Sequence, residues 1–314
     1  MAEHEVYFAS EAQMRRYKAQ KIITQVLLYG FLTLMGIFIV IPFYYMIITS
    51  FKSTDAYNQE VLNGQLNLLL TSKNFSFDQY GKVIGKSGDF GLFYANTVFV
   101  AVCSTLFTVV TSVLAAFAFA RVDFKGKNII FTVLLGTMMI PGEMMMITNF
   151  QTTMSLSWKD TFAALIFVHG VSVFYIFYLR QTFQQIPNEL FLAAKVDGYG
   201  HFSYLWKCMI PIAMPTIVTI MILSLMGAWN AYIWPQLVAS GTHPWLKFPF
   251  EGGSNHDMHL VSNGLMSKFQ STEFVSDDPA KVTCSLFATI PLFIFFLVFR
   301  KYIMRGVSRS GIKG

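Results

Sequence analysis

The feature that most constrains this chain is an uninterrupted apolar run near its start. Residues 22–51 contain no charged side chain, and Lys21 and Lys52 flank the run. A helix needs about 20 apolar residues to cross the hydrocarbon core of a bilayer, so the run is more than long enough. It is too long for the core of a signal peptide, and no small-residue cleavage pattern follows it. We therefore predict a retained transmembrane helix.

Five more apolar segments follow, which predicts six transmembrane helices, at about 22–51, 92–120, 128–150, 161–179, 208–235 and 283–299. Lipid is the expected solvent, because 54% of the side chains are hydrophobic, only 13% are charged and the mean hydropathy is +0.50. The runs show no period-two alternation, which excludes a transmembrane barrel. Backbone amides in hydrocarbon must then be satisfied within each segment. The expected fold class is an all-α polytopic membrane protein.

The distribution of Lys and Arg predicts the orientation of these helices. Fifteen of the 23 basic residues fall on the side of the membrane that holds both termini. Short basic connectors stay in the cytoplasm, so both termini are predicted to be cytoplasmic. The chain is thus divided into an N-terminal segment (1–21), a transmembrane domain (22–303) and a C-terminal tail (304–314). Within the transmembrane domain lie a cytoplasmic loop (181–207) and two outer loops (52–91 and 236–282). The net charge of +6 follows from this bias, and no nucleic acid partner is expected.

The cytoplasmic loop contains a short, well-delimited helix. Asn188 is placed to cap it, Glu189 complements its dipole, and Gly198 can take the left-handed conformation that ends it. One face of the helix carries residues at i, i+3, i+4 and i+7, namely Leu190, Ala193, Ala194 and Asp197. Two small side chains on that face leave a shallow surface for another protein's cleft. A helix lying on lipid would carry more cations than Lys195. We predict a docking helix at 189–198.

The stretch 187–215 resembles the signature loop of the membrane subunits of ABC importers. That pattern is roughly Glu-Ala-Ala, three residues, Gly, nine residues, a hydrophobic residue, two variable positions and Pro. The residues that match are Ala193, Ala194, Gly198 and Pro211. The family's glutamate falls on Leu192, and Glu189, one turn earlier, is a candidate substitute.

Other motifs are similar to the maltose-type carbohydrate permease subfamily, specifically its smaller, six-helix subunit. They are Asn96-Thr97, residues 115–121, residues 139–143, residues 183–189, Trp229-Asn230, Trp234-Pro235 and residues 300–314. The resemblance implies a type I ABC importer permease fold in a bacterial cytoplasmic (inner) membrane. The implied partners are a second permease, two ATPase subunits that bind ATP and Mg, and an extracytoplasmic solute-binding protein. The chain itself would bind no cofactor and catalyse nothing.

The resemblance also implies which residues touch the ATPases. The docking helix would couple ATP hydrolysis to transport through Glu189, Ala193, Ala194, Asp197 and Gly198. Such tails reach toward the ATPase interface, so the C-terminal residues Gly311, Lys313 and Gly314 are a second predicted contact. The basic residues nearest the last helix need only be anchors to anionic headgroups.

Candidate pathway residues lie within the apolar segments. Glu143, at the Pro141-Gly142 break, should face a cavity or a partner, as an acceptor for sugar hydroxyls, a gate residue or a structural pair at a subunit interface. Trp229 and Trp234 either anchor the helix at the membrane interface or stack on a sugar ring. Asn230 should hydrogen-bond across to a neighbour. The sequence does not specify which sugar would pass.

Two motifs are expected to be misleading. Residues 81–87 resemble a phosphate-binding loop but have three residues between the glycines where that motif needs four, and they lie on the outer side. His256-Asp257-Met258-His259 has metal-ligand residue types, yet an exposed polar loop is the expected structure and no metal site is predicted. Cys103, Cys208 and Cys284 lie within or at the edge of apolar segments, where packing is expected.

The alternative from another class is a stand-alone ion-coupled carrier or a membrane-embedded enzyme. A carrier usually shows inverted repeats and several intramembrane ionisable groups. This chain shows Glu143 alone, together with an ordered cytoplasmic helix. The permease subunit is therefore the favoured prediction.

Overall fold

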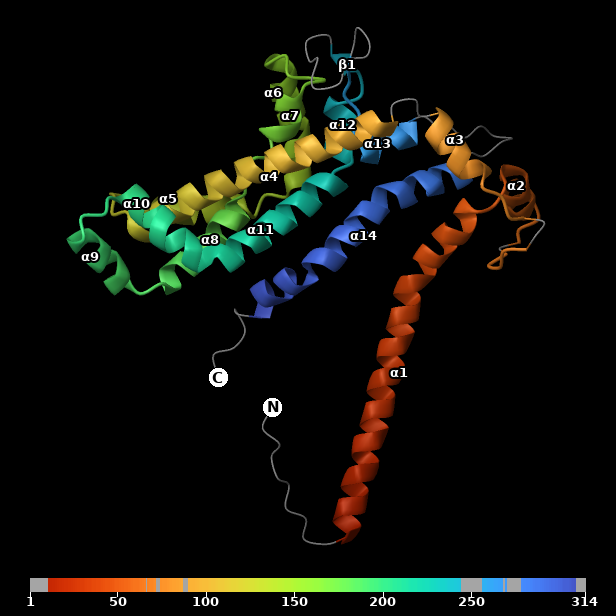
Figure 1. Cartoon of the computed structure of the whole chain (residues 1–314), viewed down its shortest axis with the longest axis horizontal. Helices are drawn as coiled ribbons and strands as arrows, with labels where there is room; N and C mark the ends of the chain where they lie inside the picture. The colour runs from red at the N-terminus through yellow and green to blue at the C-terminus, as the bar shows by residue number, and fades with distance from the viewer. Residues whose placement is uncertain are drawn as a thin grey trace.

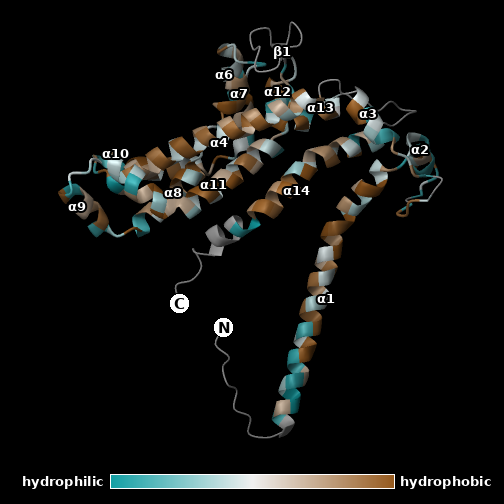
Figure 2. Cartoon of the chain, in the orientation of Figure 1, coloured by the Kyte–Doolittle hydropathy of each residue, from teal (hydrophilic) through white to brown (hydrophobic). Residues whose placement is uncertain are grey.

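The fold is a bundle of long helices from which the first helix leans away (Figure 1). The computed structural model describes residues 11–65, 67–71, 74–86, 90–243, 256–267, 269 and 278–308. Four of its helices are long and apolar enough to cross a membrane, at Gln13–Ser50, Phe90–Arg121, His201–Asn230 and Asp278–Lys301. Figure 2 shows hydrophobic residues along these helices and a hydrophilic start to the first one. The predicted all-α class is confirmed.

The first long helix, α1 (Glu11–Ser50), and the last, α14 (Asp278–Ser308), extend beyond the predicted segments. The apolar window of α1 is wholly exposed in this chain. Exposed leucine, isoleucine and phenylalanine side chains along 40 residues require lipid or another protein around them. Such a surface is typical of a membrane-spanning helix that contacts lipid or another membrane protein.

The third predicted segment is not one straight helix. α5 (Lys127–Thr137) is followed by a 3-10 turn (Gly142–Met145) and α6 (Met146–Ser155), and the two parts are bent by 87°. Pro141 lies at the break, where its ring and missing N–H prevent the helix from continuing. α5 is only about 16 Å long at 1.5 Å per residue, and Glu143 lies beyond its end, in the turn that follows.

The fourth predicted segment is also interrupted. α7 (Phe162–Ile166) ends early and α8 (Val173–Gln185) begins after Gly170. A Cβ added at Gly170 would lie 2.1 Å from Cδ1 of Phe107, so only glycine fits where the break crosses α4 (Phe90–Arg121). The Thr111 hydroxyl donates to the Gly170 carbonyl at 3.1 Å, which satisfies a backbone group that the break leaves free.

The fifth predicted segment begins earlier and ends earlier than expected. α10 (His201–Tyr204) and a π-helical turn (Leu205–Met209) lead into α11 (Ile210–Asn230), and α12 (Ile233–Val238) is separate. Together α4, α8 and α11 form the centre of the bundle, and their buried side chains make one core with α9 (Asn188–Val196). The three cysteines pack on apolar clusters, as predicted.

At the opposite end from α9 the chain forms a small cap, which we define as residues 51–86 with α13 (Val261–Ser267). It contains α2 (Thr54–Leu62) and α3 (Asp78–Lys86), and it lies near β1 (Thr242–His243) and β2 (His256–Asp257), which pair antiparallel. Phe93, Val261 and Leu265 are buried together, which joins the cap to α4 and α14. Parts of both predicted outer loops, namely α2, α3 and α13, are therefore folded helices that pack on the bundle.

Candidate functional site

The helix predicted at 189–198 is present as α9, and it ends at Gly198 as predicted. Gly198 has φ +80°, the left-handed conformation that glycine adopts without strain. The Tyr199 amide donates to the Ala194 carbonyl at 2.8 Å and the Asp197 amide to the Ala193 carbonyl at 2.9 Å, so the last carbonyls are satisfied. The predicted glycine stop is confirmed.

The start of α9 differs from the prediction. Pro187 occupies the capping position and no side chain caps the helix there. Instead, the Asn188 amide oxygen accepts a hydrogen bond at 3.2 Å from the guanidinium of Arg121, at the end of α4. The prediction that Asn188 caps the helix is wrong, because its side-chain oxygen accepts from Arg121 instead of from an amide of α9.

Arg121 holds the chain where α8 turns into α9. Its guanidinium donates to the Phe183 carbonyl at 2.9 Å and also to the Ile186 carbonyl. Both carbonyls lie at the end of α8, where the usual intrahelical donors run out, although the Phe183 carbonyl also accepts from the Ile186 amide at 3.4 Å. Charge-assisted bonds of this kind are stronger than neutral ones, so one side chain fixes the position of α9 relative to α4.

α9 buries one face on the bundle. Phe191 and Ala194 are 8% and 5% exposed, and the Phe191 ring lies 5.0 Å from that of Tyr204. The prediction that Ala193 and Ala194 share a docking surface is wrong for Ala194, because that side chain belongs to this chain's own core.

The outward face of α9 is a different set of residues at i, i+3, i+4 and i+7, namely Glu189, Leu192, Ala193 and Val196. Leu192 is 54% exposed and Val196 is 88% exposed. Sequence reasoning missed Val196, although the spacing from Leu192 and Glu189 would have found it. This apolar face, with one acidic residue at its start, is called the docking face below.

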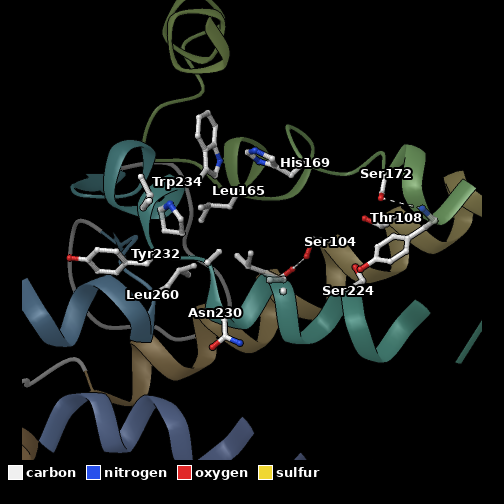
Figure 3. Close-up of a pocket in the computed structure, with 17 residues that line it drawn as sticks. Ser104, Thr108, Leu165, His169, Ser172, Ser224, Asn230, Tyr232, Trp234 and Leu260 are labelled. Atoms are coloured by element: carbon white, nitrogen blue, oxygen red, sulfur yellow. Dashed lines mark hydrogen bonds between the residues drawn. The ribbon is translucent and has the colours of Figure 1, made fainter. Parts of the chain in front are cut away.

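A cavity of about 600 Å³ lies within the bundle, between α4, the α7–α8 break, α11 and α12 (Figure 3). Hydroxyl groups reach it from three elements, namely Ser104, Thr108, Ser172, Tyr175 and Ser224. His169 and Trp234 lie beside one another at its wall, with ring centroids 5.0 Å apart. No Asp, Glu, Lys or Arg occurs among the described residues that line it.

The structure divides the predicted pathway residues. Asn230 and Trp234 line the cavity, but Trp234 is 8% exposed and its indole donates to the Ala164 carbonyl at 3.0 Å. Asn230 lies at the edge, with its amide directed away from His169 (Figure 3). The Trp229 indole donates to the Ala288 carbonyl of α14 at 3.0 Å, which makes it a packing residue between α11 and α14.

Glu143 lies in the turn between α5 and α6 and is exposed. Within the described part of the chain, no hydrogen bond or ion pair to its carboxylate occurs. Its predicted roles as a sugar acceptor, a gate residue or a structural pair at a subunit interface are therefore not tested. The predicted C-terminal contact through Gly311, Lys313 and Gly314 lies outside the described residues. Both stay predictions.

The two misleading motifs have structural explanations. Gly81, Lys82 and Gly85 lie inside the helix α3, and the Lys82 ammonium donates to the Thr54 hydroxyl at 2.8 Å. The expected exposed polar loop at 256–259 is wrong, because Met258 is fully buried and the Asn96 amide donates to the Asp257 and His259 carbonyls at 2.8 and 3.0 Å. In the described ranges, no group of three ligating side chains is assembled.

These features together define a class of protein. Apolar helices surround a hydroxyl-lined cavity, and a rigidly held helix at one end presents an uncovered face, which is the arrangement of a polytopic membrane permease. Residues 108–309 match the family described as the binding-protein-dependent transport system inner membrane component, and the chain belongs to that family. The match includes α8, α9 and all of the cavity lining except Val100 and Ser104.

Several proteins of similar sequence are named as sugar permeases. The arabinooligosaccharides transport system permease protein of Bacillus subtilis is 27% identical over 301 residues, covering 96% of this chain and all of the relative. The trehalose/maltose transport system permease protein of Thermococcus litoralis is 26% identical, with 94% and 99% covered. The polygalacturonan/rhamnogalacturonan permease protein of Bacillus subtilis is 28% identical, with 92% and 97% covered.

A solved structure confirms the fold. One chain in the crystal structure of a bacterial ABC transporter, involved in the import of the acidic polysaccharide alginate, superposes with a TM-score of 0.71. The match covers 95% of this chain and 99% of that chain at 22% identity. The predicted type I ABC importer permease fold is therefore correct.

Proposed function

We propose that this chain is one permease subunit of an ATP-driven, binding-protein-dependent importer of sugars or oligosaccharides. It forms half of a translocation pathway with a second permease in a bacterial inner membrane, with both termini in the cytoplasm. The observation that carries the proposal is the family match over 108–309, which includes most of the cavity lining and the docking face. The exposed apolar surface of α1 supports the second subunit.

Coupling to two ATPase subunits runs through α9. Glu189, Ala193, Asp197 and Gly198 take part at the surface or at the helix end, whereas Ala194 acts by holding the helix on the bundle. An ATPase that closes on nucleotide needs a rigid contact to bias a helix bundle between two states. Arg121 supplies that rigidity, because its three acceptors belong to the end of α8 and the start of α9. ATP and Mg bind the ATPase subunits.

The cavity favours a neutral sugar over an acidic or phosphorylated one. Hydroxyl groups can both donate to and accept from sugar hydroxyls. A carboxylate or phosphate would need Arg or Lys nearby, and the described lining offers neither. This distinguishes the arabinooligosaccharide-type and maltose-type relatives from those named for acidic polysaccharides.

The test is uptake into vesicles that contain the assembled transporter, with its binding protein and ATP inside. Labelled arabinotriose, maltotriose and trigalacturonate serve as probes. We expect ATP-dependent uptake of a neutral probe and none of trigalacturonate. Ser224→Phe, which fills the cavity, should reduce uptake at least tenfold, while Leu223→Phe, one position along the same helix and outside the lining, should leave it unchanged.

Two outcomes would contradict the proposal. ATP hydrolysis by the purified chain without co-purified ATPase subunits would favour a membrane-embedded enzyme. Uptake driven by an ion gradient without ATP would favour a stand-alone carrier. Uptake of trigalacturonate in preference to the neutral probes would overturn only the choice of sugar class.

A further inference from the structure

Three consecutive leucines in the cap are exposed without belonging to a helix. Leu68, Leu69 and Leu70, called the leucine strip below, are 50%, 72% and 37% exposed. They follow α2 in an irregular segment that runs beside the end of α1 (Figure 1). Three consecutive exposed leucines form an apolar surface that favours an apolar surrounding.

The strip lies at a definite height along α1. The Tyr44 hydroxyl, on α1, donates to the Leu68 carbonyl at 2.9 Å. Tyr44 is about 34 Å from Lys21 at 1.5 Å per residue, close to the ~30 Å thickness of a hydrocarbon core. Lys21 and Tyr44 thus fit the two edges of one bilayer, and tyrosine is typical of the interface.

The strip is also held rigidly from both sides. The Lys52 ammonium is fully buried and donates to the Asn67 carbonyl at 2.7 Å and to the Glu60 carboxylate at 2.5 Å. The Asn67 amide donates to the other Glu60 oxygen at 3.3 Å. On the far side, the Asn74 and Phe75 amides donate to the Thr71 carbonyl at 2.9 and 3.0 Å.

We propose that the leucine strip inserts into the membrane interface and fixes the cap to the lipid surface beside the outer end of α1. The occupant is lipid, because the hydrogen bond to Tyr44 sets the strip at interfacial depth and because the neighbouring surface of α1 is itself exposed and apolar. An irregular backbone is tolerated there, since interfacial water can satisfy its free groups, but not deeper in hydrocarbon. The buried Lys52–Glu60 pair acts as the scaffold that presents the leucines.

The test places nitroxide labels on the assembled transporter in phospholipid vesicles, in a background where the three cysteines are alanine. Leu69→Cys is compared with Val40→Cys, on the exposed surface of α1, and with Asp55→Cys, on the exposed side of α2. We expect the label at 69 to collide with oxygen more than with a water-soluble nickel chelate, as at 40. The label at 55 should show the opposite preference.

A label at 69 that behaves like the one at 55 would overturn the proposal. So would a label that becomes shielded only when the solute-binding protein is added, because the occupant would then be protein. If the cysteine-free background does not assemble, Leu69→Trp in the native background provides the same readout. The fluorescence that Leu69→Trp adds to that of the five native tryptophans should be quenched by lipids brominated near the headgroup at least twofold more than the fluorescence that Asp55→Trp adds, and equal quenching of the two increments would contradict the inference.

Discussion

The cap and α9 lie at opposite ends of the molecule, and each is held by a buried or partly buried cation that binds backbone carbonyls. The two ends differ in what they expose. At the cap, the charged pair Lys52–Glu60 is buried, and its hydrogen bonds all go to residues of the cap itself. At α9, the cation Arg121 also binds carbonyls of its own chain, but the helix that it holds turns an apolar face outward. The cap satisfies its charged pair internally, whereas α9 leaves an apolar face uncovered.

This difference shows where each end should fail. A buried ion pair that loses one member leaves an uncompensated charge, so damage at the cap should appear as lost stability. A docking face that loses its shape leaves the bundle intact, so damage there should appear as lost coupling. Variants at the two ends therefore should separate melting from transport.

The largest expected effect is at the cap. Lys52→Met leaves the Glu60 carboxylate buried without its cation, which should cost about 3–5 kcal/mol of folding free energy. Thermal unfolding of the purified complex, followed by intrinsic fluorescence, measures it. The double variant Lys52→Met, Glu60→Gln should recover much of the loss. Lys82→Met, which loses one bond to Thr54 near the surface, should barely change the melting temperature. Equal shifts for Lys52→Met and Lys82→Met would remove the role assigned to the pair.

The next effect is at the junction of α8 and α9. Arg121→Ala removes the donor that three acceptors share, and losing a hydrogen bond to a charged group costs about 1.5–3 kcal/mol. We expect at least a tenfold fall in substrate-stimulated ATP hydrolysis in reconstituted vesicles, with membrane insertion retained.

Arg180→Ala is the matched control for that junction. Arg180 links α8 to α4 through the Phe119 carbonyl at 3.3 Å, and its guanidinium lies 4.0 Å from the Phe131 ring of α5. Among the described residues it makes no hydrogen bond to α9. It should lower the melting temperature without a selective loss of coupling. If the two arginine variants lose ATP hydrolysis alike, Arg121 has no special part in holding α9.

A smaller effect is expected on the docking face. Leu192→Arg places a charge on the exposed apolar surface and should cost about 2 kcal/mol of ATPase contact, or roughly thirtyfold in affinity. Co-purification of the ATPase subunits at rising salt measures it. Ala194→Arg, on the buried face of the same helix, should instead lower the yield of folded chain. Normal folding of Ala194→Arg together with lost ATPase binding would restore the alanine pair as the docking surface.

The smallest effect concerns the end of α9. Gly198→Ala forces a side chain into the left-handed conformation at about 1–2 kcal/mol, which should loosen the last turn of α9 and slow transport severalfold. Gly200→Ala is the control, because Gly200 has φ −72°, where alanine is unstrained. Both glycines have open space around them, so crowding plays no part. Identical transport rates for the two variants would exclude conformational strain as the reason for Gly198.

What the sequence determined by itself follows from local chemistry. The apolar runs identified all-α spans because an unpaired amide in hydrocarbon is costly whatever the tertiary context. The end of α9 was predictable because glycine's freedom at φ +80° is a property of the residue. The family pattern at Ala193, Ala194, Gly198 and Pro211 could be recognised because it lies within one short stretch of the sequence, residues 193–211.

The tertiary structure alone decided which groups face inward. Gly170 interrupts a predicted helix because Phe107, far away in the chain, comes within contact distance of its backbone. Ala194 is buried because its face of α9, which also carries Phe191, packs against Tyr204, and no periodicity states which of two helix faces meets the bundle. Lys52 marked the end of an apolar run in the sequence, yet it is fully buried because Glu60 and the Asn67 carbonyl surround it. Burial depends on contacts between distant segments, and hydropathy along the chain records only each residue's preference for such contacts.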